Sequence, residues 1–324
     1  MKTTMNNKPY TVIADCRKLS YDEWLKLRKS GIGGSDCAAA CGLSRWKTRF
    51  ELWLEKSSRF TQSSVGEAAY WGRIMEPILR DEFSKRTGFE VKEMPAFFRS
   101  SANSFMQANI DGCVNTGNGY AILEIKTAGS YAVGDWEDGL PVEYYLQIQH
   151  YLAVIGADKA YVAVLLGGNK FQYQEVNRDD EMITNIVAME KDFWENYVVK
   201  DVPPPVTAAD KDLLYTLYPK TQYNVVKLSE EHSILFSRYL IAKQALDEAQ
   251  KAKDEAEAKL KALIKDASKA TCGCYTATWS EVNRKSLSND LVKQILTPEQ
   301  LESCTVITTS RRFSIKSSKG LPKK

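Results

Sequence analysis

The sequence predicts an α+β fold over its first 205 residues, followed by a different kind of extension. Segments with helical apolar periodicity occur there together with short apolar or alternating runs that are typical of strands. The run VPPPV at residues 202–206 then separates this part from a stretch rich in Ala, Lys, Glu and Leu. We therefore expect one domain over residues 1–205 and a C-terminal extension over residues 206–324.

Each element of the first domain is predicted from local periodicity and from helix-ending residues. The expected helices are residues 21–30, a short alanine-rich helix after the glycine-rich loop GIGGSD (31–36), 47–56, 67–87, 141–156 and 180–199. The expected strands are residues 89–98, 105–114, 120–127, 160–168 and 170–178, the last at a sheet edge. Gly88 should end the helix at 67–87, and Pro77 should kink this helix or mark its start.

The extension is predicted to contain a long helix near residues 230–269. Its seam repeats at steps of four and three: Leu235, Tyr239, Ala242, Leu246, Ala249, Lys253, Ala256, Leu260 and Leu263. Small residues in this seam bury little area, which favours packing within the chain over an intermolecular coiled coil. A small β-rich appendage is expected at residues 271–318, with strands in CYTATWSEV and RRFSIK.

Composition limits the classes of protein to which the chain can belong. Its 44 basic and 41 acidic residues give no overall polybasic character, so a nucleic-acid site would need a local basic groove. Seven scattered cysteines and two histidines argue against a disulfide framework and a zinc site. Without an apolar run of membrane-span length or the apolar core of a signal peptide, we expect a cytoplasmic protein that does not enter a membrane.

The segment FMQANIDGCVNTGNGYAILEIKTAG (105–129) holds the most informative polar residues. It is predicted to form two strands joined by a Gly/Asn turn, with Asp111 at the end of the first strand. Glu124 and Lys126 alternate with Ile125 along the second strand, so both should point to one face and Ile125 to the opposite core. Surface charges on a solvated hairpin are the alternative. The apolar neighbours of Glu124 argue against it, because a charge in a buried strand needs a partner.

Two carboxylates beside one ammonium suit the hydrolysis of a phosphodiester. Mg²⁺ prefers oxygen ligands, neutralises charge on a phosphate and lowers the pKa of a bound water. Lys126 can orient that water or stabilise the transition state. Glu76, in WGRIMEP, could supply a further metal ligand, and Gln147, in YYLQIQHYL, could contact a metal-bound water or a phosphate. Alternatively, Glu76 is an exposed charge on a helix and Gln147 is an ordinary polar residue.

The loop GIGGSD and the basic residues near it suggest an anion site. Backbone N–H groups at a helix start bind anions, so Gly34 and Ser35 could approach a phosphate closely. Arg28 could hold a terminal phosphate with its two-pronged guanidinium. Lys47 and Arg49 could extend a basic track along a DNA backbone, although a solvated surface is the more common fate of such residues.

The order of these motifs resembles that of the YqaJ-type viral recombinase family. The stretches WLKLRKSGIGGSD, WGRIMEP, NIDG, LEIK and YYLQIQHYL follow one another over about residues 20–200. That family is similar to phage lambda exonuclease, within the PD-(D/E)XK nuclease superfamily. The resemblance implies a restriction-endonuclease-like core, a mixed central sheet flanked by helices. One departure is Ile110, at the position where the superfamily name has proline.

The resemblance also implies roles for individual residues. The catalytic group would be Asp111, Glu124 and Lys126, completed by Glu76 and Gln147. Two Mg²⁺ ions, replaceable by Mn²⁺, would be held by Asp111, Glu124, the Ile125 carbonyl and Glu76. Arg28 and Ser35 would hold the 5′-phosphate of the strand being degraded.

The function implied is a 5′→3′ exonuclease acting on the ends of linear double-stranded DNA. It would leave 3′ single-stranded tails for an annealing protein of the RecT or Red-beta type and, like the lambda enzyme, would form a homo-oligomer, a trimeric ring. The alternatives are a Cas4-like or restriction-type nuclease, and a DNA-end-binding recombination adaptor with an inactive nuclease fold. A purely structural coiled-coil protein would explain residues 230–269 but nothing in the first domain.

Overall fold

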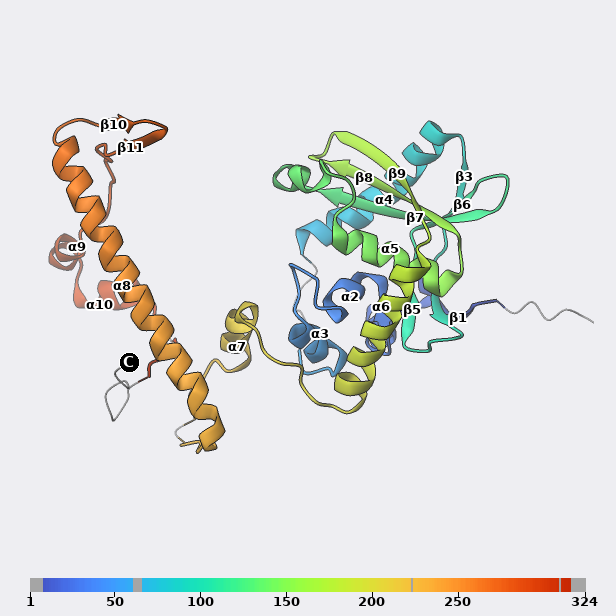
Figure 1. The fold of residues 1–324 in the computed structure, drawn as a ribbon, viewed down its shortest axis with the longest axis horizontal. Coiled ribbons are helices and arrows are strands. Elements are labelled where there is room, and N and C mark those ends of the chain that lie inside the picture. Colours follow the sequence, from blue (N-terminus) through green and yellow to red (C-terminus); the bar gives the residue numbers. More distant parts are fainter. Residues whose placement is uncertain (1–7, 61–65, 223, 309, 316–324) are drawn as a thin grey trace, which may run out of the picture. The chain divides into compact units, whose positions relative to one another are not determined.

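The computed structural model describes residues 8–60, 66–222, 224–308 and 310–315 (Figure 1). These residues form two compact units, of which the first ends at Leu214 and the second begins at Tyr215. The predicted boundary at residue 205 lies before a turn that still packs on the first unit. There the buried Asp210 accepts hydrogen bonds from the hydroxyl groups of Thr48 and Thr207.

A five-stranded mixed sheet forms the centre of the first unit. Its order is β3-β6-β7-β8-β9, with β7 and β8 parallel and the other neighbours antiparallel. Its strands are β3 (Glu90–Lys92), β6 (Gly112–Asn115), β7 (Tyr120–Ala128), β8 (Lys159–Leu166) and β9 (Lys170–Asn177). The prediction of an edge strand over residues 170–178 is confirmed.

A second sheet has the order β1-β4-β5-β2. Its strands are β1 (Tyr10–Asp15), β4 (Ala96–Ser100), β5 (Met106–Ala108) and β2 (Ile32–Gly33). The expected single strands at 89–98 and 105–114 are therefore wrong, because each run is divided between the two sheets. The first run breaks before β4 at Pro95, which has no N–H to donate and whose carbonyl accepts from the Cys16 N–H at 2.7 Å.

Six helices surround these sheets close to the predicted positions. They are α1 (Tyr21–Lys29), α2 (Gly34–Ala40), α3 (Arg49–Lys56), α4 (Glu67–Thr87), α5 (Val142–Ile155) and α6 (Asp180–Phe193). Ser20 and Glu23 form a capping box at the start of α1, and Gly88 ends α4 in the left-handed conformation at φ 73°. Helix α4 runs through Pro77, so this proline does not mark its start.

The two faces of β7 meet different helices. Leu123 and Ile125 pack with Leu79 and Phe83 of α4, as expected for the apolar side of the strand. Helix α5 contacts β7 and β8 of the central sheet, together with β4 and β5 of the second sheet. These contacts confirm a mixed α+β fold with helices flanking a mixed sheet, and they leave the even-numbered side chains of β7 facing α5.

The second unit is built on a single long helix. Helix α7 (Lys211–Leu217) contains the boundary between the two units. The elements after it are α8 (Ser233–Ile264), β10 (Lys269–Cys272), β11 (Tyr275–Thr278), α9 (Asn289–Ile295) and α10 (Pro298–Ser303). The strand expected at RRFSIK is not formed over its described residues 311–315, where Phe313 instead packs edge-to-face on Tyr239 of α8 at 5.4 Å. Among the described helices of the whole chain, none is both long and apolar enough to cross a bilayer.

Candidate active site

Asp111 lies where the chain passes from the second sheet into the central one. It directly precedes β6, so the prediction that it ends a strand is wrong, although the hairpin of β6 and β7 is formed as expected. Its Oδ2 accepts a hydrogen bond from the backbone N–H of Ile125 at 2.7 Å. This bond fixes the carboxylate against the middle of β7, between the positions of Glu124 and Lys126.

Glu124, Lys126 and Gln147 form a closed network between β7 and α5. Lys126 Nζ donates to Glu124 Oε1 at 2.6 Å and to Gln147 Oε1 at 3.0 Å. Gln147 Nε2 donates to the same Glu124 oxygen at 2.6 Å. The strand alternation therefore does place Glu124 and Lys126 on one face, and α5 presents Gln147 to that face.

The second oxygen of Glu124 is left without a partner. Glu124 is only 4% exposed, and its Oε2 has no hydrogen bond within the described part of the chain. Burial raises the pKa of this carboxyl to about 8, and the nearby Asp111 adds to the rise, whereas Lys126 opposes it. A buried carboxyl oxygen without a hydrogen bond is a strong acceptor for which a partner is expected.

Asp111 and Glu76 share this electrostatic environment. Burial raises the pKa of Asp111, although Lys126 and the Ile125 N–H oppose the rise. Glu76, on α4, forms an ion pair with Arg80, yet burial together with the Asp111 charge raises its pKa to about 7. We call Glu76, Asp111 and Glu124 the carboxylate cluster. It comprises three acids whose pKa values are all raised, chiefly by burial, although Lys126 and Arg80 oppose the rise.

The residues of the carboxylate cluster fit a hard divalent cation. They offer carboxylate oxygens, the ligand type that Mg²⁺ and Mn²⁺ prefer, and the free Glu124 oxygen has no other positive partner among the described residues. Lys126 remains charged in this setting. Burial alone would lower its pKa, but Glu124 and Asp111 together raise it. A cation and an ammonium can therefore act side by side here.

Tyr151 connects this network to the glycine-rich segment. Its hydroxyl accepts from Gln147 Nε2 at 3.1 Å, and its ring lies where a side chain at Gly34 would have to go. Gly34 begins α2 after the short strand β2, so its lack of a side chain is required for close packing on Tyr151.

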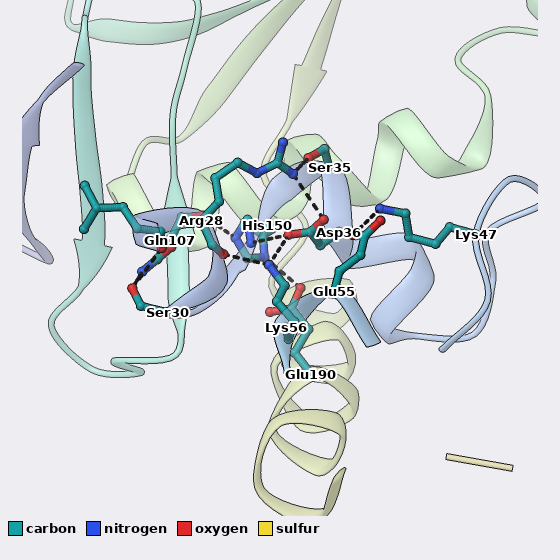
Figure 2. Close-up of polar contacts among 12 residues, drawn as sticks. Arg28, Ser30, Ser35, Asp36, Lys47, Glu55, Lys56, Gln107, His150 and Glu190 are labelled. Atoms are coloured by element: carbon teal, nitrogen blue, oxygen red, sulfur yellow. Dashed lines mark hydrogen bonds and ion pairs between the residues drawn. The ribbon is translucent and has the colours of Figure 1, made fainter. Parts of the chain in front are cut away.

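A second polar group surrounds Arg28 (Figure 2). Arg28 Nη2 donates to Ser35 Oγ at 3.0 Å and to Asp36 Oδ1 at 3.3 Å, while its guanidinium lies 5.1 Å from the centre of the Trp24 ring. Asp36 is 2% exposed and also accepts from the Gly33 N–H at 3.2 Å. Asp36 therefore fixes both the glycine-rich loop, through the Gly33 N–H, and the Arg28 side chain.

Lys56 completes this group and was missed in the sequence analysis. Its Nζ donates to Asp36 Oδ2 at 2.6 Å and to the Arg28 carbonyl at 2.8 Å, with only 4% of the side chain exposed. Burial lowers the pKa of Lys56, and the charge of Asp36 opposes this change. Burial raises the pKa of Asp36, but the charges of Lys56 and Arg28 hold the Asp36 pKa well below its usual range. Arg28, Asp36 and Lys56, the cationic cluster, thus combine two cations with one carboxylate.

Lys47 and Arg49, expected on a basic track, are each paired with an acid. Lys47 Nζ lies 2.6 Å from Glu55 Oε2, and Arg49 Nη2 lies 2.8 Å from Asp192 Oδ2. Arg49 also lies over the Tyr197 ring at 4.9 Å. Contacts of either residue with DNA remain a prediction.

One cavity of about 740 Å³ is lined by the cationic cluster and reaches one member of the carboxylate cluster. Its lining includes all three members of the cationic cluster, as well as Glu76 of the carboxylate cluster and Arg73 of α4. Arg73 is exposed and forms no ion pair among the described residues. The cavity therefore leads from a cation-rich pocket to an edge of the acidic site.

His150 lies close to the cationic cluster but makes its hydrogen-bond contacts with other residues (Figure 2). Its ring nitrogens lie 2.7 Å from Glu190 Oε1 and 2.8 Å from the Gln107 carbonyl oxygen, both of which are acceptors, and all of these atoms are buried. Burial would lower the pKa of His150, but Glu190 and the Gln107 carbonyl raise it above its usual value. Cys37 lies near this pair, and the ligand atoms of Cys37, His150 and Glu190 lie within 4.8 Å of one another.

The chain is similar to known proteins both in its first unit and over nearly its whole length. Residues 23–158 match the YqaJ-like viral recombinase domain. Protein YqaJ of Bacillus subtilis strain 168 is 38% identical over 319 residues, covering 96% of this chain and 99% of that protein. The chain belongs to the YqaJ-like viral recombinase family. The predicted resemblance to this family is thereby confirmed, and the match includes nearly the whole relative, with its C-terminal part.

Two solved structures are similar to the chain at lower levels. An alkaline exonuclease from Laribacter hongkongensis has a TM-score of 0.47 and 19% identity, covering 60% of this chain and 99% of its own. A phage-related exonuclease from Haemophilus somnus 129PT has a TM-score of 0.40 and 13% identity, covering 55% of this chain and 99% of its own.

Proposed function

We propose that this member of the family is a divalent-metal-dependent exonuclease that degrades one strand of linear double-stranded DNA from its 5′ end. The observation that carries the proposal is the buried Glu124 carboxylate, which has one oxygen free and the other bonded to Lys126. A cavity links this acidic site to a cationic pocket. Such a layout matches a substrate with a terminal phosphate at one end and a scissile phosphodiester at the other.

Asp111, Glu124, Glu76 and the Ile125 carbonyl would hold the cation. Mg²⁺, or Mn²⁺ in its place and with two ions per site, would neutralise charge on the scissile phosphate and lower the pKa of a bound water. Lys126 Nζ, fixed by Glu124 and Gln147, orients the attacking water and stabilises negative charge that develops on the phosphate.

The cationic cluster would set the register of the strand. Arg28 and Ser35 present a guanidinium and a hydroxyl group that can bind the 5′-phosphate together. Arg28 and Lys56 share the single carboxylate of Asp36, so the cluster keeps a net positive charge beside the cavity. Because the bound terminal phosphate would be the 5′-phosphate, digestion would proceed from the 5′ end.

A nuclease assay tests this proposal directly. Purified protein is incubated with 5′-phosphorylated duplex DNA and Mg²⁺, and nucleotide release is measured alongside 5′-hydroxyl and 3′-phosphorylated duplexes. Release from the 5′-phosphorylated duplex, absent in EDTA and leaving a 3′ single-stranded tail, is the expected result. Tight binding to DNA ends without hydrolysis in Mg²⁺ or Mn²⁺ would favour a recombination adaptor instead.

The same proposal extends to partners and assembly. The 3′ tail would be passed in the cytoplasm to an annealing protein of the RecT or Red-beta type, and the nuclease would work as a ring of three copies. The second unit would dock the annealing protein or brace the ring. Its removal after Leu214 should change either the solution mass or the capture of the annealing protein, and an unchanged result in both measurements would remove this role.

A further inference from the structure

An aromatic ring, Tyr144, lies beside the Lys126 ammonium, and two tryptophan rings pack on Tyr144. Lys126 Nζ is 4.9 Å from the centre of the Tyr144 ring, on the first half of α5. Tyr144 stacks on Trp136 at 5.3 Å and meets Trp46 in a tilted contact at 5.5 Å. Trp46, Trp136 and Tyr144, here the aromatic platform, come from three separate segments of the first unit. Tyr144 contacts Lys126 directly, whereas Trp46 and Trp136 reach the site only through Tyr144.

Arg45 connects the segments that carry the platform. Its guanidinium lies 4.9 Å from the centre of the Trp46 ring and forms ion pairs with Asp135 at 2.9 Å and with Glu143 at 3.1 Å. The Ser44 hydroxyl accepts from the Trp46 N–H at 3.1 Å. Arg45 therefore ties the loop that carries Trp46 to Asp135, beside Trp136, and to Glu143, beside Tyr144.

Trp46 nevertheless remains largely in solvent. It is 57% exposed, whereas Trp136 and Tyr144 are half-buried. A tryptophan that is fixed in orientation and left open to water exposes a large apolar face without contributing that face to the core. Its position beside the site indicates that the face receives part of a substrate.

We propose that the aromatic platform stacks an unpaired nucleobase of the DNA strand whose phosphate lies at Lys126. This inference rests on the proposed function, because it takes Lys126 to mark the scissile phosphate. Every nucleobase offers a flat face, so aromatic stacking binds single-stranded DNA with little sequence preference. An exonuclease that processes any sequence needs such a contact to hold the terminal nucleotide after its base pair has opened.

The electrostatic surroundings favour a nucleotide over an apolar peptide. Arg45 forms ion pairs with Asp135 and Glu143, and the Lys126 ammonium lies over the Tyr144 ring. The proposed function places a phosphate at Lys126. The base that the rings would stack is covalently attached to that phosphate through its nucleotide, whereas an apolar peptide brings no such group to Lys126.

The test measures binding of short fluorescent single-stranded oligothymidylates, with Ca²⁺ in place of Mg²⁺ and with the intactness of the strand checked on a gel. The variants are Trp46→Leu, which keeps apolar volume but lacks a ring, and Trp46→Phe, which keeps a ring. Trp279→Leu is the matched control, since Trp279 is an exposed tryptophan of the second unit that also has a cation, Lys261, over its ring. Circular dichroism melts compare the folding of all variants.

We expect Trp46→Leu to weaken binding about tenfold, with Trp46→Phe and Trp279→Leu close to the parent protein. The difference between Trp46→Leu and the parent should disappear for a strand that has abasic sites at its 5′ end. Unchanged binding by Trp46→Leu, or an equal loss with the abasic strand, would overturn the inference. Nucleotide release in Mg²⁺ separates the two proposals. If Trp46→Leu weakens binding of the normal strand but not of the abasic strand, and the parent protein releases no nucleotide, then only the exonuclease activity is contradicted.

Discussion

The two charged clusters of the first unit carry opposite imbalances. In the carboxylate cluster three acids face two cations, Lys126 and Arg80, and one Glu124 oxygen has no partner among the described residues. In the cationic cluster two cations face one acid, Asp36. The first cluster therefore lacks a positive charge and the second lacks a negative one.

The pKa shifts express the same contrast. The pKa of Glu124 is raised to about 8 and that of Glu76 to about 7, whereas the pKa of Asp36 is held below its usual range by Lys56 and Arg28. Burial raises the pKa in every case, so the neighbouring charges decide the sign. A fully buried acid can thus be either a group prepared for a cation or a fixed counter-ion, depending on the charges beside it.

Lys126→Ala should produce the largest effect, on the rate of hydrolysis. The substitution removes the one ammonium of the acidic site, and nucleotide release should fall by about 10²–10³-fold or more. The fold should persist, because Lys126 holds the pKa of Glu124 down and without it the Glu124 carboxyl protonates more readily. Lys159→Ala, which removes a partly exposed lysine paired with Glu175, serves as the control. A Lys126→Ala protein with the parent rate would contradict the proposed role.

Lys56→Met should produce the next largest effect, on stability. It leaves Asp36 buried with only Arg28 as an ionic partner, which should cost about 3–5 kcal/mol in the free energy of unfolding. Urea unfolding measures this loss, and the double variant Lys56→Met/Asp36→Asn should recover part of it, because the unpaired charge is then absent. A single variant as stable as the parent would show that Asp36 does not depend on Lys56.

Local signals explain which parts of the fold could be predicted from the sequence. The capping residues Ser20 and Gly88 set helix limits within a residue or two, and alternation placed Glu124 and Lys126 on one face of β7. The division of residues 89–98 between two sheets has no comparable signal. It depends on the bond between Cys16 and Pro95, which are far apart in the sequence.

The site shows the same limit. Lys56 stands at the end of an ordinary amphipathic helix, and nothing in its sequence neighbourhood indicates that Asp36 lies beside it. Tyr151 and Gly34 likewise become related only when α5 packs on α2. Residues close in sequence or on one strand could be grouped in advance, whereas contacts between elements required the fold.

The pH dependence of stability should separate the carboxylate cluster from the cationic one. A glutamate has a pKa of about 4.3 in an unfolded chain, whereas Glu124 and Glu76 titrate at about 8 and about 7 in the fold. Between these values the folded protein binds more protons than the unfolded chain, so metal-free stability should fall as the pH rises toward 8. Melting temperatures in EDTA should drop by a few degrees over this range.

A cation bound at the acidic site should reverse this trend. Adding Mg²⁺ should raise the melting temperature most at high pH, where the carboxylates are ionised, and Glu124→Gln should reduce both the pH slope and the Mg²⁺ effect. A matched substitution of an exposed acid, Glu175→Gln, should leave both unchanged. Equal Mg²⁺ effects at low and high pH would place the cation elsewhere.

Ser35→Ala should produce the smallest effect, confined to recognition of the strand end. Ser35 is exposed and bonds to Arg28 Nη2 at 3.0 Å, so its loss removes one hydroxyl while Asp36 still holds the arginine. A net hydrogen bond contributes about 0.5–1.5 kcal/mol. The preference for 5′-phosphorylated over 5′-hydroxyl duplex, measured as a ratio of kcat/KM, should therefore fall about two- to tenfold, with the maximal rate unchanged. Thr184→Ala, a loss of another exposed helix hydroxyl, is the control. A fall in the maximal rate with the preference intact would mean that Ser35 serves the acidic site, and that the two clusters do not divide the ends of the substrate between them.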